Sequence, residues 1–374
     1  MKVRAIRWTP FRVPFAAGFT TAAGEMTVRE GVLLQLMTSD GITGLGEGSP
    51  LAAFGGGTVA DVLAVLQDRS PALIGADLAS VPGVVATLPR DRSGAAAAYS
   101  ALDIAAWDAL GRSRGVRVAS LLGGSVTPIV PVNATVGAST AESAATAARA
   151  AVDAGFHTVK LKVGIAGSPE AEAERVAAVR EAIGLETGLR LDANGAWTED
   201  EAIETIRRLE AFRPQYIEQP LPAGDPAALA RVRHAVMMPV AADEAVTDLA
   251  AVKALIGAAA ADVLIVKPMA VGGLEPARTI VELGTLAGLR VVVTTTIDTG
   301  IGISAALHLA ATLSRPIPAC GLATGPLLAS DLLVEPLVVR DGEMRLPAGR
   351  GLGVAIDEAQ LAQYATGAGA GVGY

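Results

Sequence analysis

The spacing of hydrophobic and polar residues divides the chain into two parts with different patterns. In the first part, Lys2–Pro14 and Gly31–Met37 alternate or run apolar in a way that predicts strands, and Thr38–Gly41 predicts a hairpin turn. Gly94–Leu110 repeats Ala, Leu and Trp at three- and four-residue intervals, which predicts a helix. These elements indicate a small α+β domain over residues 1–125.

From Val130 onward, short apolar runs alternate regularly with helical stretches. Helix starts are predicted at two capping boxes, Ser139 with Glu142 and Thr198 with Glu201, and at Ser168-Pro169. The apolar runs lack a clear alternation of polar and apolar residues, as expected of parallel strands covered on both faces. These runs are Phe156–Val163, Leu189–Asp192, Gln215–Glu218, Met238–Ala242, Val263–Val266 and Leu289–Thr294. This pattern over residues 126–330 leaves two fold classes, a doubly wound α/β sheet or a (β/α) barrel.

Charged residues stand at the C-terminal end of one predicted strand after another. They are Lys160 and Lys162, Asp192, Glu218, Asp243 and Lys267. Each one alone is ordinary, because a strand lysine is usually solvated and a loop carboxylate usually forms a turn or a helix cap. Unrelated surface residues would not be expected at the same position, the end of the strand, in five successive strand-helix units. A barrel brings all of its strand ends to one rim, where barrel active sites lie, so the pattern favours a barrel.

Three carboxylates that meet at one rim repel each other unless a cation neutralises them. Asp192, Glu218 and Asp243 offer only oxygen ligands, and neither His nor Cys occurs at these strand ends. Such a donor set indicates a hard ion such as Mg²⁺ rather than zinc. A divalent cation of this kind stabilises the enediolate that forms when a carboxylate substrate loses the proton on its adjacent carbon.

The base for that proton must lie near the metal without binding it. Lys160 and Lys162 are two residues apart and therefore project from the same face of their strand. A second ammonium group and a nearby dication both favour the neutral amine form of the catalytic lysine. Lys267 lies on the other side of the carboxylates and is a second acid–base group or a stabilising cation. The sequence thus predicts proton abstraction between two lysines.

Composition narrows the class of protein without changing this picture. The chain has 374 residues, 51% of them hydrophobic, and a formal charge of -8, which disfavours disorder and binding to a phosphate backbone. The longest uncharged runs are too short for a membrane helix, and Arg and Pro interrupt the region where a signal peptide would need an apolar core. The single cysteine, Cys320, excludes an internal disulfide. We therefore expect a cytoplasmic protein.

Together these motifs resemble the enolase superfamily, in its muconate-lactonising subgroup. The motifs are Lys160-Leu-Lys162, Asp192-Ala-Asn194-Gly, Glu218-Gln-Pro, Asp243-Glu244 and Lys267-Pro. The pairing of a lysine base with Mg²⁺ is a known feature of enolase-type sites. The resemblance covers nearly the whole chain and implies a (β/α)7β barrel over residues 126–330 and an α+β capping domain over residues 1–125. Residues 331–374 would return to the cap and end in a flexible tail.

This resemblance also implies the roles of the site residues. Asp192, Glu218 and Asp243 would bind Mg²⁺, with Lys162 and Lys267 on either side of a small-molecule carboxylate substrate. The mandelate-racemase-like subgroup would instead place a His-Asp pair on later strands, and no His follows such a strand here. The sequence leaves the oligomeric state open, including a homo-oligomer.

Within the subgroup, two segments are similar to o-succinylbenzoate synthases. Gly46–Gly55 contains Gly-Glu-x-x-Pro-Leu followed by Phe, and Ala319–Gly325 leads to Leu327–Asp331. Dipeptide epimerases would have Asp-x-Asp where this chain has Leu322-Ala-Thr324, so an anchor for a peptide amino group is missing. Asp298 stands where many relatives carry Glu, and Ala52 replaces a frequent Pro.

The implied reaction is the syn dehydration of 2-succinyl-6-hydroxy-2,4-cyclohexadiene-1-carboxylate to o-succinylbenzoate in menaquinone biosynthesis. Lys162 would remove the proton alpha to the ring carboxylate and then protonate the departing hydroxyl, while Lys267 stays cationic. Asn194, Thr296 and Asp298 are candidates for orienting the substrate or supporting Lys267. The Gly-rich stretches near residues 18–24 and 46–57 would close over the barrel mouth and exclude water.

Three alternatives remain open at this stage. An N-acylamino acid racemase or a muconate cycloisomerase would use the same site. A non-catalytic or phosphate-binding barrel is the remote alternative, because Gly272-Gly273 precedes a predicted helix and could hold a phosphate there.

Overall fold

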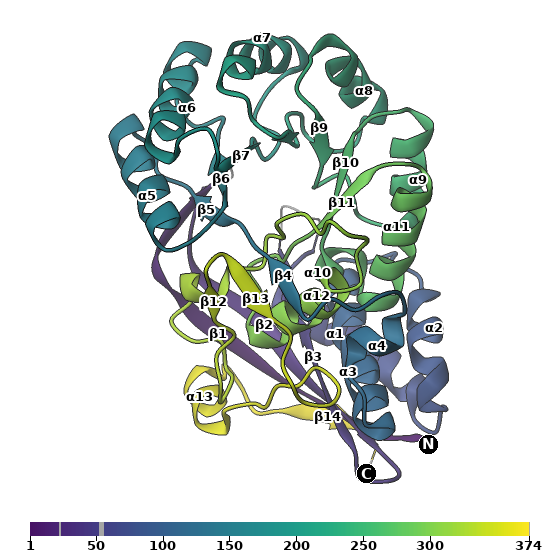
Figure 1. Ribbon diagram of the computed structural model, residues 1–374. Helices are drawn as coiled ribbons and strands as arrows, with labels where there is room; N and C mark the ends of the chain where they lie inside the picture. Colours follow the sequence, from purple (N-terminus) through teal and green to yellow (C-terminus); the bar gives the residue numbers. More distant parts are fainter. Residues whose placement is uncertain (22–23, 52–55, 374) are drawn as a thin grey trace.

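The computed structural model describes residues 1–21, 24–51 and 56–373 of the chain (Figure 1). Its N-terminal part is built on an antiparallel sheet with the strand order β14-β1-β2-β3. The strands are β1 (Val3–Thr21), β2 (Gly24–Thr38), β3 (Thr43–Gly48) and β14 (Ala370–Val372). The predicted hairpin turn between β2 and β3 is confirmed, since the Gly41 amide donates to the Thr38 carbonyl at 3.1 Å.

Helices cover one face of this sheet. They are α1 (Val59–Arg69), α2 (Val81–Ala86) and α3 (Ala95–Arg114), with short 3-10 turns η2 (Ser70–Leu73) and η3 (Leu78–Ser80). Strand β3 lies so close to α3 that a Cβ on Gly46 would be 2.0 Å from the Ala101 carbonyl oxygen. The Gly-rich stretch predicted as a loop from Gly46 therefore begins inside a strand, where glycine is needed for backbone packing. Below, "the cap" means β1–β3, β14 and α1–α3.

The second part is a barrel, as the sequence predicts. Seven parallel strands run in the order β11-β10-β9-β8-β7-β6-β5. They are β5 (Ala134–Val136), β6 (Thr158–Lys162), β7 (Gly188–Asp192), β8 (Ile217–Glu218), β9 (Val240–Ala242), β10 (Val263–Val266) and β11 (Arg290–Val293). Cys320 and Gly321 form parallel bridges to Val132 and Thr294, so this segment links the two edges of the sheet as an eighth strand. The (β/α)7β fold with a separate cap is confirmed.

Helices surround the barrel and connect its strands (Figure 1). They are α5 (Ala141–Asp153), α6 (Pro169–Ile183), α7 (Glu199–Leu209), η4 (Glu210–Phe212), α8 (Pro226–Ala235), α9 (Leu249–Gly257), α10 (Pro268–Val271), α11 (Leu274–Leu286) and α12 (Gly300–Ala310). The predicted starts of α6 at Ser168 and of α7 at Thr198 are confirmed. The prediction for α5 is wrong by one residue, because Thr140 and Ser143 form the capping box in place of Ser139 and Glu142.

Smaller elements join the two parts. They are α4 (Val118–Leu122), β4 (Ile129–Pro131), η5 (Gly325–Leu327), β12 (Val339–Arg340), β13 (Glu343–Arg345) and α13 (Glu358–Tyr364). The expectation of a flexible tail is wrong for residues 370–372, which form β14. Ala370, Gly371 and Val372 pair with Trp8, Arg7 and Ile6 of β1, so a short Gly-rich segment adds an edge strand to the cap.

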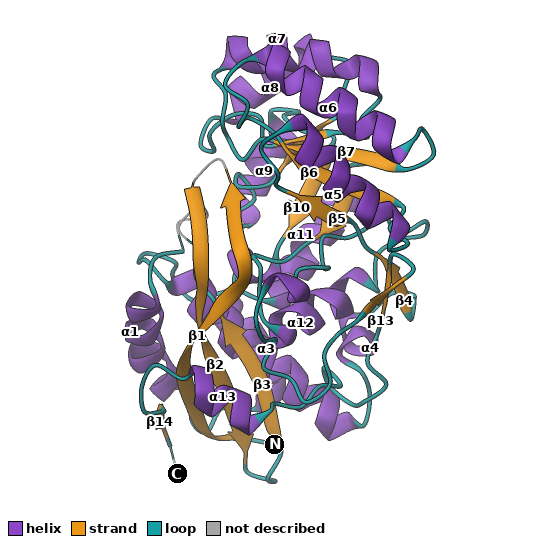
Figure 2. Cartoon of the chain, turned by 90° about the vertical axis from the view of Figure 1, so that its left-hand side faces the viewer, coloured by secondary structure: helices purple, strands orange, loops and turns teal. Residues whose placement is uncertain are grey.

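The paired ends of β1 and β2 extend from the cap sheet toward the barrel (Figure 2). The proposed closing segments lie partly in this region. Residues 22–23 and 52–55, which include Ala52 and Phe54, are outside the described residues, so their predicted role remains a prediction.

A carboxylate of the cap occupies the helix N-terminus that sequence analysis weighed as a phosphate site. The Oδ2 atom of Asp103 accepts hydrogen bonds from the backbone amides of Leu274 and Glu275, in the first turn of α11. A Cβ on Gly273 would lie 2.4 Å from the same oxygen. A side chain of the protein itself thus already accepts the hydrogen bonds of the first amides of this helix. The phosphate-binding alternative at Gly272-Gly273 is wrong.

The most apolar helix, α12, is buried along its whole length against the barrel and the cap. No helix in the described part of the chain has the length and hydrophobicity needed to cross a membrane. His308 on α12 accepts a hydrogen bond from the Ala119 amide through Nδ1, and its Nε2 contacts the Leu352 carbonyl at 3.1 Å. Burial lowers the pKa of His308 from 6.5 to about 4, so the ring is neutral in the folded protein.

This histidine predicts a stability loss in acid. Between pH 7 and 4 the unfolded chain gains a proton on His308 that the folded chain does not, so stability falls with pH by about 3 kcal/mol from this group. Urea unfolding of the native protein and of His308→Gln at several pH values measures it. As pH falls, the His308→Gln variant should become more stable relative to the native protein. A difference that stays constant with pH would contradict the prediction.

Candidate active site

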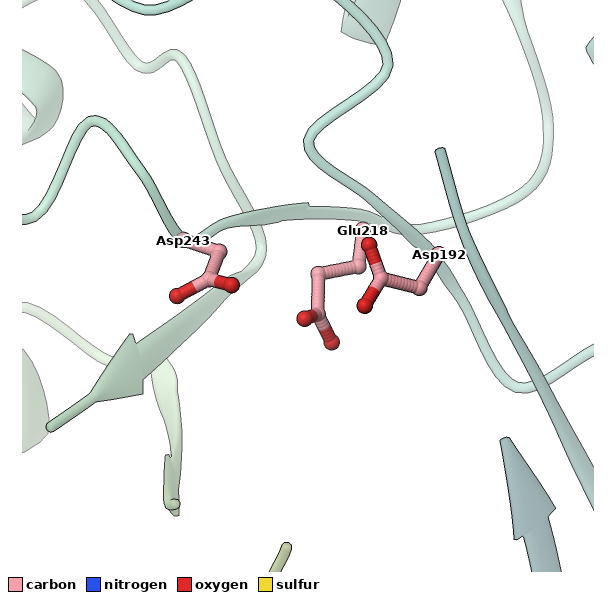
Figure 3. Close-up of side chains that lie close together, drawn as sticks. All are labelled: Asp192, Glu218 and Asp243. Atoms are coloured by element: carbon pink, nitrogen blue, oxygen red, sulfur yellow. The ribbon is translucent and has the colours of Figure 1, made fainter. Parts of the chain in front are cut away.

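The strand register brings the predicted site residues to one level of the barrel. Lys162 pairs with Asp192 in the ladder between β6 and β7, and Asp192 pairs with Glu218 between β7 and β8. Asp243 follows β9, the next strand along the sheet. Figure 3 shows the three carboxylates projecting from neighbouring strand ends toward a common space. The arc predicted from spacing alone is therefore present.

The donor atoms of this arc fit a divalent cation. Asp192, Glu218 and Asp243 are buried, and each offers a carboxylate oxygen within 4.8 Å of the other two. Glu218 Oε2 and Asp243 Oδ1 are buried and have no hydrogen-bond partner among the described residues. Buried carboxylate oxygens require a partner, and an oxygen-only set of this kind suits Mg²⁺.

The pKa values of the three carboxylates show that the arc carries more negative charge than its surroundings balance. Burial and the charge of Asp192 raise the pKa of Glu218 to about 8. Burial also raises the pKa of Asp243, although Lys267 opposes the shift. Burial alone would raise the pKa of Asp192, but Lys160 and Lys162 hold it well below its ordinary value. The pocket therefore favours protonation of part of the arc unless positive charge is added.

Two lysines of β6 contact this arc from one side. Lys160 Nζ donates to Asp192 Oδ2 and to Glu218 Oε1, both at 2.8 Å. Burial alone would lower the pKa of Lys160, but Asp192 and Glu218 hold it well above its ordinary value. Lys160 therefore stays an ammonium group and neutralises part of the acidic arc.

The second lysine of β6 is held by two residues of the β7 end. Lys162 Nζ donates to Asp192 Oδ2 at 2.6 Å and to Asn194 Oδ1 at 2.7 Å. The Asn194 amide in turn donates from Nδ2 to Glu244 Oε1 at 2.9 Å. Asn194, predicted to orient the substrate or to support Lys267, thus contacts Lys162 directly.

Lys267 reaches the arc from the far end. It follows β10, and its Nζ donates to Asp243 Oδ2 at 2.5 Å. The side chains of Lys162 and Lys267 are about one-tenth exposed, at 10% and 9%. The buried carboxylates therefore lie between two nearly buried lysine side chains that come from strands on opposite sides of the arc.

Thr296 and Asp298 are engaged with the cap. Thr296 Oγ1 donates to Asp298 Oδ1 at 2.5 Å and accepts from Arg29 Nη2 at 3.2 Å. Arg29 Nε also donates to the Ile297 carbonyl at 3.0 Å. Burial and the charge of Glu47 raise the pKa of Asp298 to about 7, with Arg29 opposing the shift. In the structure these polar groups join β2 of the cap to the segment after β11.

Several residues of this region were not predicted from the sequence. Gln219 Oε1 accepts from the Asp243 amide at 3.0 Å and so links the ends of β8 and β9. Glu47 accepts from Ser49, from the Thr299 amide and hydroxyl, and from the Gly302 amide, and therefore caps α12 from the cap side. Gln219 and Glu244 belong to motifs quoted in the sequence analysis, so their place in these motifs could have indicated that they lie at the site. Glu47 was also inside a quoted motif, the Gly-Glu-x-x-Pro-Leu segment. Arg29 had no such signal for its contact with the barrel, because Ile297 is 268 residues away in sequence.

Comparison with known proteins identifies the family to which the chain belongs. Residues 3–123 match the N-terminal domain of the mandelate racemase / muconate lactonizing enzyme family, and residues 142–360 match the enolase C-terminal domain-like family. The chain belongs to the enolase superfamily, in its mandelate racemase / muconate lactonizing enzyme family. It is an enzyme, and its relatives place it in the muconate-lactonising subgroup.

Three similar proteins have different activities. Muconate cycloisomerase 1 of Rhodococcus opacus is 32% identical over 365 residues, 96% of each chain. The o-succinylbenzoate synthase of Thermobifida fusca is 40% identical over 235 residues, which are 63% of this chain and 70% of that one. A crystal structure of the dipeptide epimerase of Enterococcus faecalis with Mg and L-Leu-L-Tyr has a TM-score of 0.89 at 30% identity, covering 95% of this chain and 100% of that chain.

These comparisons agree with the chemistry of the donor set. The predicted cofactor, Mg²⁺, is confirmed by the metal in a similar enzyme and by the buried carboxylates Asp192, Glu218 and Asp243 of this chain. The substrate is not decided by them, because the three similar proteins act on different compounds.

Proposed function

We propose that this enzyme removes a proton alpha to the carboxylate of a small molecule, with Mg²⁺ held by Asp192, Glu218 and Asp243. The observation that carries the proposal is the placement of Lys162 and Lys267 on either side of this buried triad. Bound Mg²⁺ supplies positive charge to the substrate carboxylate while the adjacent carbon loses its proton. Lys160 remains an ammonium group and limits the negative charge of the arc.

Within this chemistry we propose o-succinylbenzoate synthesis as the reaction. Lys162 Nζ takes the proton from the ring carbon next to the carboxylate, and the electron pair of that C–H bond forms the new ring double bond. The C–O bond on the same face breaks, and Lys162 returns its proton to the departing hydroxyl, which leaves as water. The product ring is aromatic, so the step is strongly downhill. Lys267 stays cationic beside the anionic substrate.

Two observations favour this substrate over a dipeptide. The T. fusca synthase is 40% identical to this chain over 235 residues, whereas the E. faecalis dipeptide epimerase is 30% identical. In addition, the segment after the eighth strand, Leu322-Ala-Thr324, has no carboxylate for a peptide amino group. Leu322 is buried, and the Thr324 hydroxyl lies 2.9 Å from that of Thr295.

The second candidate is an isomerase on the same residues. The R. opacus muconate cycloisomerase aligns over nearly the whole chain, which supports cycloisomerisation of a muconate. An N-acylamino acid racemase would use both Lys162 and Lys267 for proton transfer, one on each face of the substrate, and the near-symmetric burial of these lysines allows it.

Direct turnover with Mg²⁺ distinguishes the candidates. We expect efficient dehydration of the cyclohexadiene carboxylate, followed by the absorbance of the aromatic product, and kcat/KM at least about 100-fold lower for cis,cis-muconate and N-succinyl amino acids. Negligible dehydration with efficient racemisation or lactone formation would replace the proposed reaction by the corresponding isomerase. Turnover of any of these substrates at an unchanged rate without Mg²⁺ would reject metal-assisted proton abstraction itself.

A further inference from the structure

We propose that Asn194, oriented by Glu244, is a positioning residue that aims the reactive nitrogen of Lys162 at the substrate. The inference rests on the proposed function, since it takes Lys162 as the base. It concerns Asn194 and Glu244, which belong to the same two motifs as the proposed metal ligands Asp192 and Asp243.

The starting observation is the number of groups that hold Lys162. Its Nζ donates to Asp192 Oδ2 at 2.6 Å and to Asn194 Oδ1 at 2.7 Å. A neutral lysine amine has two N–H bonds and one lone pair in a tetrahedral arrangement. When Asp192 and Asn194 accept from the two N–H bonds, the lone pair has only one remaining direction. The hydrogen bonds therefore define the line along which the amine can accept a proton.

The same direction serves the second half of the reaction. After Lys162 has accepted the proton, that new N–H bond occupies the third position of the nitrogen, while Asp192 and Asn194 still hold the other two. The proton is then delivered along the line on which it arrived. Removal of the proton and departure of the hydroxyl are thereby confined to one face, as a syn elimination requires.

The orientation of the Asn194 amide is itself determined by its neighbours. In its ammonium form Lys162 only donates, so in that state the amide must present its oxygen on that side. Glu244 Oε1 accepts from the amide nitrogen at 2.9 Å, so the carboxylate demands the same orientation from the other side. The backbone position of Asn194 is also defined. Its φ is 46°, which asparagine tolerates, and its backbone N–H donates to Asp192 Oδ1 at 3.1 Å.

Glu244 can provide this support because it is enclosed. It is 8% exposed, and its other oxygen, Oε2, is buried without a hydrogen-bond partner among the described residues. The side chain is therefore largely shielded from solvent, and the Nδ2–H of Asn194 is the hydrogen bond that the structure gives to its carboxylate. Loss of Glu244 would free the amide to turn its NH₂ group toward Lys162, where it could not accept the N–H bond that Asn194 Oδ1 accepts in the structure.

A double-mutant cycle tests whether Glu244 acts through Asn194. With Mg²⁺ and substrate saturating, we expect Asn194→Ala to lower kcat about 10- to 100-fold while KM stays within about threefold, because a small misplacement of a reacting group is costly. Glu244→Ala should lower kcat about 10-fold, and the double variant should be no worse than Asn194→Ala. Effects that multiply would overturn the proposal, since Glu244 would then act elsewhere.

The matched control is Asn133→Ala, which removes the other asparagine of the chain, a buried amide that precedes β5 and contacts Arg190. It should change thermal stability without the kcat loss. Calorimetric Mg²⁺ affinity should stay within about threefold in Asn194→Ala. A loss of Mg²⁺ binding in this variant would overturn the positioning role, because Asn194 would then be part of the metal site.

A readout without turnover separates this inference from the proposed function. In ¹⁵N-lysine spectra of the Mg²⁺-loaded protein, with the Lys162 signal assigned by Lys162→Arg, Asn194→Ala should shift or broaden the Lys162 Nζ signal and leave that of Lys267 unchanged. An unchanged Lys162 signal overturns the inference whatever the substrate is. A shifted signal in an enzyme whose Lys162→Ala variant retains full dehydration rejects the proposed function and not the hydrogen-bond link.

Discussion

Replacement of Lys162 by Ala is expected to lower kcat for dehydration about 10⁴-fold, because a positioned general base and acid contributes up to this factor. The variant keeps Asp192, Glu218 and Asp243, so Mg²⁺ affinity should change little by comparison. Stopped-flow absorbance of the aromatic product measures the rate, and calorimetry measures the metal. Retention of more than about one-tenth of the wild-type rate would contradict the role of Lys162.

The matched variant is Lys267→Ala, which removes an ammonium group of the same kind and burial from the other side of the arc. In a dehydratase it loses only electrostatic support, so kcat should fall less, about 10²-fold. In a racemase the two variants would each abolish solvent deuterium exchange into one enantiomer of an N-succinyl amino acid. Equal losses of activity in the two variants, together with deuterium exchange into both enantiomers by the native enzyme, would favour the racemase.

The barrel and its acidic arc could be predicted from the sequence because both depend on local order. Each strand-helix unit returns the chain to the same rim, so residues at one phase of successive units must converge. Lys162, Asp192 and Glu218 are direct neighbours in the ladders for this reason. Spacing along the chain was sufficient information for these positions.

Contacts between the cap and the barrel could not be predicted in this way. Arg29 donates to the carbonyls of Ser49, Pro50 and Ile297, and the last of these is 268 residues away in sequence. Nothing in the pattern of residues near Arg29 indicates that partner. The same limit applies to Thr296 and Asp298. Their role toward the substrate or Lys267 stays a prediction, and the structure adds two contacts that the sequence did not indicate, a hydrogen bond between them and one from Arg29 to Thr296.

The errors in secondary structure have a different origin. At α5, Ser139, Thr140 and Ser143 are all suitable capping residues, and only the backbone conformation selects Thr140. At the C-terminus, Gly and Ala have little intrinsic preference for a strand. The pairing of Ala370 with Trp8 supplies the backbone hydrogen bonds that composition alone could not anticipate.

Removal of Mg²⁺ is expected to abolish activity and to make stability fall as pH rises. The pKa of Glu218 is raised from 4.5 to about 8 by burial and by Asp192, so the folded apoprotein holds a proton that the unfolded chain has lost. Stability from this group is therefore complete below pH 4.5 and lost as pH rises through 8, by about 2 kcal/mol between pH 6.5 and 9. Mg²⁺ replaces that proton, so its stabilising effect should be larger at pH 9 than at pH 6.5.

Glu218→Gln isolates this contribution, because it keeps the shape of the side chain and removes its charge. We expect the variant to lose at least about 10³-fold in kcat/KM, since a ligand of the divalent ion and its charge are gone. Its apoprotein should be more stable than the native apoprotein at pH 9 and should lack the Glu218 part of the pH dependence.

Asp298, whose pKa is raised to about 7, is present in both proteins and cancels in the comparison. Thermal unfolding of both proteins with EDTA and with Mg²⁺ at pH 6.5 and 9 measures these effects. Parallel pH dependences in EDTA, or Mg²⁺-dependent turnover by Glu218→Gln at the wild-type rate, would show that Glu218 is not the residue in which proton and metal compete.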